Sequence, residues 1–553
     1  MLEDLSVLVV EANQGMRAQL RSMLEGFQLT RVQFAPSAGA ALRKLRDQRF
    51  DLILCEYNLG DGQDGQHLLE DLRNQQIIPL DTLFVMISSE RSYERIVGAA
   101  ELAPNDYILK PLTASALLVR LQRAVAKRDA FLPIHRAIAG GDPQEAIELC
   151  VQAEQAHPAY RTDFMRLRAE LHGGLGQARQ AEAVYRDILA TRPIPWAQLG
   201  LARTLFASGR LDDAETILEA LVAESTYYLD AYDWLARVRE ALGFPRQACE
   251  VLASAVELSP HRVGRLRRFG ELAVSAGDYE AAERALEEVV RKGKHSDFRD
   301  PEDHLRLVRS QLLQQRFAEA EATIRDLDRT MGGTRGAAAC SALSKALLHQ
   351  GRGEHAAARE AMRLAVAASR DEAELSTTLK CELVRGCLDH QLEAEGSEVV
   401  ADILRNAGDE QTIEMTRAVL RERGREDLSE RIEERLHAEV RQYIAAGARK
   451  AQGGDYDGAV SEMMSAVRRM PGNPHVLFNA ALALLRHIEH NGWNDRFAAQ
   501  ARTLIQRTRR LDPANPRLEA IGDFLRGLVR KHGIRPATAT APRGGSRADP
   551  DHG

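Results

Sequence analysis

Two carboxylates, a hydroxyl and an amine stand where short apolar segments of the N-terminal region end. These four residues are Glu11, Glu56, Ser88 and Lys110. The short apolar segments before them are typical of strands buried in a parallel sheet. Because a doubly wound sheet carries its site at the carboxyl ends of its strands, we expect the four side chains to converge there. Glu56 would then reach towards Lys110 and Ser88.

Strand and helix patterns alternate through the first part of the chain. The expected strands include segments 6–10, 51–55, 84–89 and 106–109. Apolar residues recur with helical periodicity in segments 38–45, 68–72, 93–100 and 113–125. This alternation predicts an α/β fold with a doubly wound five-strand parallel sheet.

The order of these elements resembles the receiver domain of two-component response regulators, which has a flavodoxin-like fold. Receivers carry an acidic pair after the first strand and a phosphoryl-accepting aspartate at the end of the third. A hydroxyl residue follows the fourth strand, and a Lys-Pro pair follows an aromatic residue of the last strand that many receivers reorient on activation. The matching positions here are Glu11, Ala12, Glu56, Asn58, Ser88, Tyr107 and Lys110. The resemblance implies a receiver whose acceptor aspartate is replaced by Glu56.

The resemblance also implies an incomplete metal site. The residues that match the family's Mg²⁺ ligands are Ala12, Glu56 and the carbonyl of Asn58. Mg²⁺ demands near-octahedral oxygen coordination, and Ala12 supplies no side-chain oxygen. Glu56 is one methylene longer than aspartate, which moves its carboxylate by about 1.5 Å, and misplacement on the order of 1 Å can cost about a hundredfold in rate. We therefore expect no cofactor and no metal, apart from weak Mg²⁺ binding at Glu11 and Glu56.

Three interpretations of Glu56 stay open. In the first, its carboxylate pairs with Lys110 and partly mimics a phosphoryl group, which carries about −1.5 to −2 charge. In the second, the site is inactive and the sheet serves only as a docking surface. In the third, a nearby aspartate accepts the phosphoryl group; the candidates are Asp51, Asp61 and Asp64. Asp51 begins its strand at the wrong end, and Asp64 is placed to cap the next helix.

After Lys110 the strand signals give way to paired helices with a recurring turn. Ala214, Ala248 and Ala282 each follow a turn glycine and are spaced by 34 residues, which is the tetratricopeptide period. The glycine permits positive φ, the alanine lets two helices approach closely, and a proline ends the second helix. Residues 131–330 and 440–520 thus resemble tetratricopeptide repeats, which predicts an all-α solenoid.

We expect five segments along the chain. They are a receiver at 1–128, tetratricopeptide repeats at 129–330, degenerate helical repeats at 331–440, C-terminal tetratricopeptide repeats at 441–534 and a disordered tail at 535–553. The helix that begins near residue 113 continues into the repeats without a flexible linker, so the junction should be rigid. The Gly-rich loop at 331–336 could act as a hinge.

Composition narrows the compartment and the class of protein. No apolar run approaches the roughly 18 to 20 residues that span a bilayer, and the six cysteines are scattered singly, so we expect a cytoplasmic protein with free thiols. The net charge of −6, from 74 basic and 80 acidic residues, argues against a general nucleic-acid binder. Cys381, Cys387 and His390 lack the close spacing of a zinc site. The sequence contains no P-loop, H-E-x-x-H or G-x-S-x-G motif, and we expect no enzymatic activity.

The repeats predict a protein-binding groove lined by the first helix of each unit. The arginines that would lie along this groove are Arg166, Arg203, Arg237 and Arg267. Because arginine binds carboxylates in bidentate fashion, an acidic partner segment is one hypothesis. The alternative is that these arginines are solvated or paired with nearby acidic residues, namely Glu170, Asp233 and Glu271.

Two functions stay open. The first is a non-enzymatic signalling adaptor whose receiver binds a histidine kinase or another response regulator while its repeats bind a further protein. The second is a conventional phosphorylation-switched response regulator with Glu56 as an unusual acceptor. Receivers often pair through the fourth helix, last strand and fifth helix, so a homodimer is also expected. The residues on that face are Ile96, Val97, Tyr107 and those of the 113–125 helix.

Overall fold

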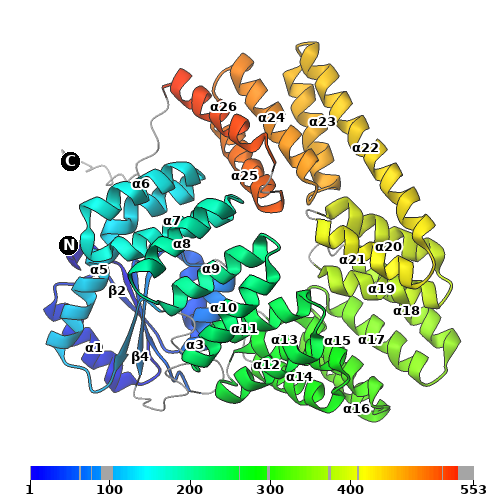
Figure 1. Ribbon diagram of the computed structural model, residues 1–553, viewed down its shortest axis with the longest axis horizontal. Coiled ribbons are helices and arrows are strands. Elements are labelled where there is room, and N and C mark those ends of the chain that lie inside the picture. The colour runs from blue at the N-terminus through cyan, green and yellow to red at the C-terminus, as the bar shows by residue number, and fades with distance from the viewer. Residues whose placement is uncertain are drawn as a thin grey trace, which may run out of the picture. The chain divides into compact units, whose positions relative to one another are not determined.

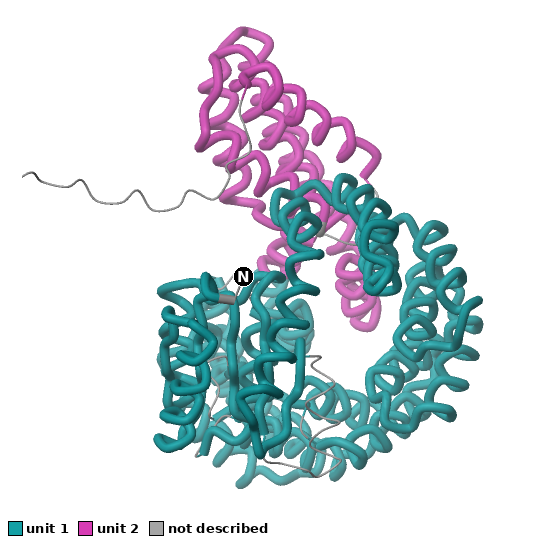
Figure 2. The backbone as a smooth tube through the Cα atoms, turned by 90° about the vertical axis from the view of Figure 1, so that its left-hand side faces the viewer, with its two compact units in different colours: residues 1–396 teal, residues 397–553 magenta. Residues whose placement is uncertain are grey.

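The computed structural model describes most of the chain. The described residues are 2–60, 64–75, 77–88, 104–260, 262–294, 299–370, 375–407, 410–512 and 515–533. They form two compact units, residues 1–396 and 397–553, which Figure 2 shows in different colours. Several expected features lie outside the described residues, namely Asp61, the helix at 93–100 with Ile96 and Val97, and the tail at 535–553.

The N-terminal domain is built on a five-stranded parallel sheet (Figure 1). Its strands are β1 Val7–Val10, β2 Val32–Ala35, β3 Leu52–Glu56, β4 Leu83–Ser88 and β5 Asp106–Leu109. The strand order β2-β1-β3-β4-β5 is that of a doubly wound sheet, as predicted. The carboxyl ends of β1, β3, β4 and β5 therefore lie at one edge, and they carry the predicted polar residues.

Helices cover both faces of the sheet. They are α1 Gln14–Gly26, α2 Ala38–Asp47, α3 Gly65–Asn74 and α5 Ala114–Gly140. Leu8 and Ile53 pack with α2 and α3 on one face, while Val9 and Leu54 pack with α1 and α5 on the other. Because strand side chains alternate between two covered faces, β1 and β3 are apolar along nearly their whole length.

Helix α5 joins this domain to the repeats without a break. Leu117 and Leu121 belong to the core under the sheet, whereas Phe131 and Ile134, further along the same helix, pack with the first repeat helices. The expected boundary near residue 128 falls inside this helix. A continuous helix transmits a rigid orientation from one core to the next.

The remaining elements are helices, apart from short 3-10 turns at Leu2–Asp4 and Pro158–Tyr160. In the first unit they are α6 Pro143–Ala156, α7 Arg161–Gly174, α8 Ala178–Thr191, α9 Pro195–Ala207, α10 Leu211–Glu224, α11 Leu229–Ala241, α12 Pro245–Leu258, α13 Val263–Ala276, α14 Tyr279–Gly293, α15 Pro301–Leu313, α16 Phe317–Met331, α17 Ala337–Gly351, α18 His355–Ser369 and α19 Thr377–Asp389. The unit boundary falls in α20 Glu393–Asn406, and the second unit continues with α21 Glu410–Glu422, α22 Glu426–Gln452, α23 Tyr456–Arg469, α24 Pro474–Asn491, α25 Asp495–Leu511 and α26 Leu518–Lys531.

The repeats turn where a residue adopts positive φ, as the sequence predicts. Gly209 and Gly277 have φ values of 75° and 86°, a conformation that glycine adopts without strain. Before α16, where the sequence has no glycine, Gln315 takes the same conformation with φ 60°. The three alanines that define the period are fully buried. The backbone turn therefore persists even where its sequence signal is lost.

The first helices of successive pairs form a continuous inner row. Helix α7 contacts α9, α9 contacts α11, and α13 contacts α15. In tetratricopeptide solenoids such a row lines the concave binding surface. The predicted groove arginines lie on α7, α9, α11 and α13.

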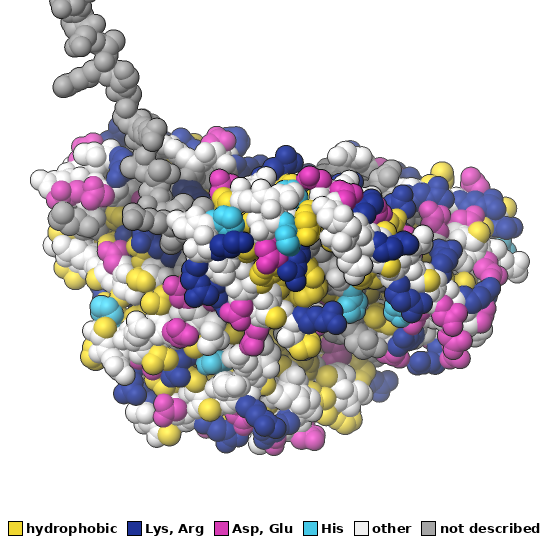
Figure 3. Space-filling model, turned by 90° about the horizontal axis from the view of Figure 1, so that it is seen from above, with side chains coloured by type: hydrophobic (Ala, Val, Ile, Leu, Met, Phe, Trp, Pro, Cys, Tyr) yellow, Lys and Arg dark blue, Asp and Glu magenta, His cyan; other side chains and the backbone are white. Residues whose placement is uncertain are grey.

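Surface charge is mixed. Figure 3 shows Lys and Arg side chains intermingled with Asp and Glu over the face seen from above. All six cysteines are buried, and none of them forms a disulfide. Among the helices of the described ranges, none is long and apolar enough to cross a membrane.

Candidate functional site

Lys110 lies between two buried carboxylates at the carboxyl edge of the sheet. Glu11 and Glu56 are only 3% and 5% exposed. The Nζ atom of Lys110 is 3.0 Å from Oε2 of Glu11 and also forms a close ion pair with Oε2 of Glu56. The structure thus brings together three of the four residues predicted to converge.

Backbone amides fix both carboxylates. Oε1 of Glu11 accepts a hydrogen bond from the Asn13 amide at 2.9 Å, and Oε1 of Glu56 accepts one from the Asn58 amide at 3.1 Å. Each carboxylate therefore uses one oxygen for the backbone and the other for Lys110.

The ion pairs set the titration of the lysine. Burial alone would lower the pKa of Lys110, but its hydrogen bonds and attraction to Glu56 and Glu11 outweigh burial and raise the pKa above the ordinary value. Lys110 therefore stays protonated at neutral pH. Burial and the negative charge of Glu56 raise the pKa of the neighbouring Cys55 thiol well above its ordinary value, so that thiol is unreactive.

The end of β3 is packed too tightly to admit another side chain. A Cβ atom on Gly65 would lie 2.3 Å from the Glu56 carbonyl oxygen, so only glycine fits there. Asp64 caps α3 by accepting from the His67 amide at 2.8 Å. Asp51 accepts from the Ser6 amide at 2.8 Å at the opposite end of the strands. Neither aspartate is placed to substitute as a phosphoryl acceptor.

The residues at this edge fit Mg²⁺ poorly. Ala12 offers no side-chain oxygen, and Glu11 and Glu56 already share a cation, Lys110. Within the described ranges, no cluster of three His, Cys, Asp or Glu side chains could hold a metal ion. Each carboxylate already has one oxygen bound by Lys110 and the other by a backbone amide, so few oxygens are left to coordinate a divalent cation.

The remaining predicted receiver residues lie beside the ion pairs. Ser88 is buried at the end of β4, and its carbonyl accepts from the Lys110 amide at 2.8 Å. Tyr107, on β5, is half-buried and packs against the core shared with α2 and α3. Asn58 is exposed, and its side chain accepts from the Gly60 amide at 3.1 Å.

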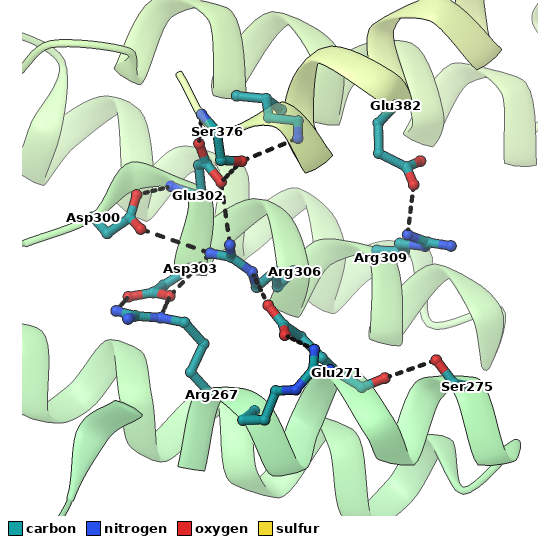
Figure 4. A network of polar contacts seen from close by, with 12 residues as sticks. Arg267, Glu271, Ser275, Asp300, Glu302, Asp303, Arg306, Arg309, Ser376 and Glu382 are labelled. Atoms are coloured by element: carbon teal, nitrogen blue, oxygen red, sulfur yellow. Dashed lines mark hydrogen bonds and ion pairs between the residues drawn. The ribbon is translucent and has the colours of Figure 1, made fainter. Parts of the chain in front are cut away.

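Of the predicted groove arginines, Arg267 belongs to an internal ion-pair network. Its guanidinium binds both oxygens of Asp303, at 2.6 and 2.8 Å. Figure 4 shows that Arg306 joins the same carboxylate to Glu271 and Glu302, across α13 and α15. Asp303 is 5% exposed. Arg267 therefore holds the repeats together and is not free for a partner.

Arg166 is partly engaged, and the expected pairings are only partly correct. Arg166 Nε lies 2.9 Å from Glu170, as the alternative interpretation expects. Asp233, however, pairs with Arg262 and Arg265. Glu271 pairs with Arg268 on its own helix, α13, and with Arg306 on α15. The contacts of Asp233 and Arg306 cross between helices because adjacent first helices pack side by side.

Arg203 and Arg237 instead both lie over the ring of one tryptophan, Trp234. Their guanidinium carbons are 5.1 and 4.8 Å from the ring centre of Trp234. Arg166 likewise lies 5.1 Å from the ring centre of Trp196. The sequence analysis did not identify these tryptophans. The spacing of three residues between Trp234 and Arg237 on one helix was the available signal.

Known families match both regions of the chain. A family model for the response regulator receiver domain matches residues 7–122. Chemotaxis protein CheY-3 of Vibrio cholerae is 30% identical over 122 residues, which are 22% of this chain and 92% of that protein. The receiver domain protein (CheY-like) of Methanospirillum hungatei is 24% identical, with a TM-score of 0.21 over 23% of this chain and 98% of that structure.

The second match concerns the helical region. A tetratricopeptide repeat model matches residues 166–228 and 267–334. A tetratricopeptide repeat protein of Parabacteroides merdae is 15% identical, with a TM-score of 0.32 over 46% of this chain and 96% of that structure.

Proposed function

We propose that this chain, which belongs to the response regulator receiver family through residues 7–122, is a non-enzymatic signalling adaptor. Its receiver works without phosphorylation, and its tetratricopeptide repeats bind a partner protein. The observation that carries the proposal is the contact of Lys110 with both Glu11 and Glu56.

The ion pairs give Glu56 part of the role of a phosphoryl group. In a phosphorylated receiver, the negative oxygens of the phosphoryl group face the lysine that corresponds to Lys110. Here the longer Glu56 side chain presents a carboxylate to Lys110 from the same strand end. The mimicry is partial because a carboxylate has one charge and two oxygens, whereas a phosphoryl group carries about −1.5 to −2 charge and three acceptor oxygens.

The same contacts oppose phosphoryl transfer to Glu56. Transfer needs a free nucleophile in line with the donor and cations that neutralise the developing charge. One Glu56 oxygen is bound by the Asn58 amide and the other by Lys110. Ala12 removes a metal ligand as well, so both the nucleophile and its metal are compromised.

Partner binding belongs to both domains in this proposal. The receiver binds a histidine kinase or another response regulator, and the repeats bind a further protein. Self-association through the receiver is part of the proposal. Leu109 and Val119, on β5 and α5, are 42% and 64% exposed and offer apolar area for it.

The direct test is the intact mass of the full chain after incubation with acetyl phosphate and Mg²⁺. We expect no mass increase from a phosphoryl group. The matched control is the double variant Ala12→Asp, Glu56→Asp, which restores the family's acidic residues and should gain one phosphoryl group. A gain by the unaltered chain at a rate similar to that of the double variant would overturn phosphorylation independence and favour a switched response regulator.

A further inference from the structure

Two arginines of the repeats stack on a tryptophan and form no ion pair with a described carboxylate. Arg203, on α9, and Arg237, on α11, are exposed and both contact Trp234. In the part of the chain that the structure describes, neither guanidinium has a carboxylate at ion-pair distance. Other arginines of these helices differ: Arg239 lies 3.0 Å from Glu215 and also binds Glu219.

Trp234 holds this pair in place. Its ring packs edge-to-face on Phe206, with centroids 5.6 Å apart, and it borders the core formed by α8 to α11. A guanidinium stacked on an aromatic face keeps its N–H groups in its own plane, where they remain free to donate. Stacking also lowers the side-chain entropy that would be lost on binding. The arginines are thus preorganised for planar, bidentate acceptors.

A second arginine–aromatic pair extends the same surface. Arg166, on α7, lies over Trp196, which is on α9 like Arg203. Burial raises the pKa of Tyr228 to about 12, and the nearby charges of Arg166 and Arg203 act in the opposite direction. The Tyr228 hydroxyl is therefore close to both Arg166 and Arg203. The Arg166–Trp196 pair and the Arg203–Trp234 pair thus lie near each other on the inner row of helices.

We propose that Arg203 and Arg237, held on Trp234, bind carboxylate side chains of an acidic segment in the partner protein. We name this surface, made of Arg166, Trp196, Arg203, Trp234 and Arg237, the Arg–Trp surface. The inference rests on the proposed function only in requiring that the repeats bind a protein. It also corrects the expectation that all four groove arginines could bind a partner, because Arg267 is paired with Asp303.

Charge around the Arg–Trp surface favours a protein segment over nucleic acid. Glu170, Asp230 and Asp233 lie on the same helices, and each pairs with an arginine. The positive charge of Arg203 and Arg237, which have no described carboxylate beside them, is therefore local. A few carboxylates match a local cationic spot, whereas a nucleic-acid backbone gains its affinity from many phosphate contacts.

The test is selection of peptides from a random phage-displayed library by the full-length chain. We expect the peptides that bind the unaltered chain to be enriched in Asp and Glu. The variant Arg203→Gln, Arg237→Gln should lose this enrichment. It should bind a selected acidic peptide about tenfold more weakly in fluorescence anisotropy, the scale of a lost charge-assisted contact. Circular dichroism should show unchanged helix content.

The matched control is Arg239→Gln. This residue is two positions from Arg237, about 200° around the same helix, and its partners are Glu215 and Glu219. The control should retain acidic enrichment and affinity. Equal enrichment by the double variant, or tighter binding of a single-stranded oligonucleotide than of the peptide, would overturn the Arg–Trp surface while leaving the adaptor function intact. Failure of the unaltered chain to enrich any peptide would count against both.

Discussion

The receiver and the repeats both hold cationic side chains, but the groups that contact these side chains differ. Lys110 lies between Glu11 and Glu56, whose buried carboxylates cancel its charge. Arg203 and Arg237 lie on Trp234, whose ring attracts a cation without neutralising it. The cation of the receiver site is therefore paired with carboxylates, whereas Arg203 and Arg237 have no carboxylate at ion-pair distance among the described residues.

The largest effect on stability should come from removing the ion pairs of Lys110 with Glu11 and Glu56. Lys110→Met leaves two buried carboxylates without their cation, and we expect a loss of about 3 to 5 kcal/mol in stability of the N-terminal domain. Hydrogen exchange of peptides from β1 and β3, measured by mass spectrometry on the full chain, would report the loss.

The control for that variant is Lys127→Met. Lys127 is 46% exposed and pairs with the equally exposed Asp163, so its removal should cost about 0 to 1 kcal/mol. Equal exchange in the two variants would mean that the Lys110 ion pairs contribute no more than a surface contact.

A smaller effect should separate structural from available arginines within the repeats. Arg267→Gln removes two hydrogen bonds from the buried carboxylate of Asp303, which then retains its contact with Arg306. We expect this change to destabilise the repeats by about 2 to 3 kcal/mol. Arg237→Gln removes only a stacking contact and should cost about 0.5 to 1 kcal/mol. Thermal unfolding followed by circular dichroism measures both. The reverse order of stability would remove the distinction between the two arginines.

The smallest effect concerns pH. His67 Nδ1 lies 2.8 Å from Asp64 Oδ1. Burial lowers the pKa of His67, but the hydrogen bond that its ring donates to Asp64 outweighs burial and raises the pKa above 6.5. Burial raises the pKa of Asp64, but the hydrogen bond with His67 outweighs it and lowers the pKa below 3.8.

The sign follows from the two shifts. The histidine contribution is fully present below pH 6.5 and is lost as the pH rises through the raised pKa. The aspartate contribution is present above pH 3.8 and is lost as the pH falls through the lowered pKa. Protection of α3 amides should therefore be greatest between these values and decline towards alkaline pH. In His67→Gln that alkaline decline should be absent, and an unchanged profile would exclude the pair as its source.

The sequence specified the receiver edge better than the repeat surface. Glu11, Glu56 and Lys110 could be brought together from sequence because a parallel sheet gathers strand ends at one edge. The turn glycines were equally predictable, since positive φ is a local property. Gln315 shows the limit, because tertiary packing imposes φ 60° on a residue that gives no such signal.

Side-chain partners between helices were less predictable. Arg267 and Asp303 are 36 positions apart, and Asp233 pairs with arginines of the following helix. Every first helix carries several charged residues, so sequence spacing leaves many pairings equivalent until the helix crossing is known. The role of Trp234 was missed for the same reason, because Arg203 reaches it from another helix.

Phosphorylation independence is tested by the affinity of the full chain for a selected acidic peptide, with and without acetyl phosphate and Mg²⁺. We expect the same affinity in both conditions, because Lys110 is already paired with Glu56 and the Arg–Trp surface does not depend on a phosphoryl group. A change of about tenfold on adding acetyl phosphate, absent from the Glu56→Gln variant, would contradict it and show that Glu56 accepts a phosphoryl group that controls the repeats.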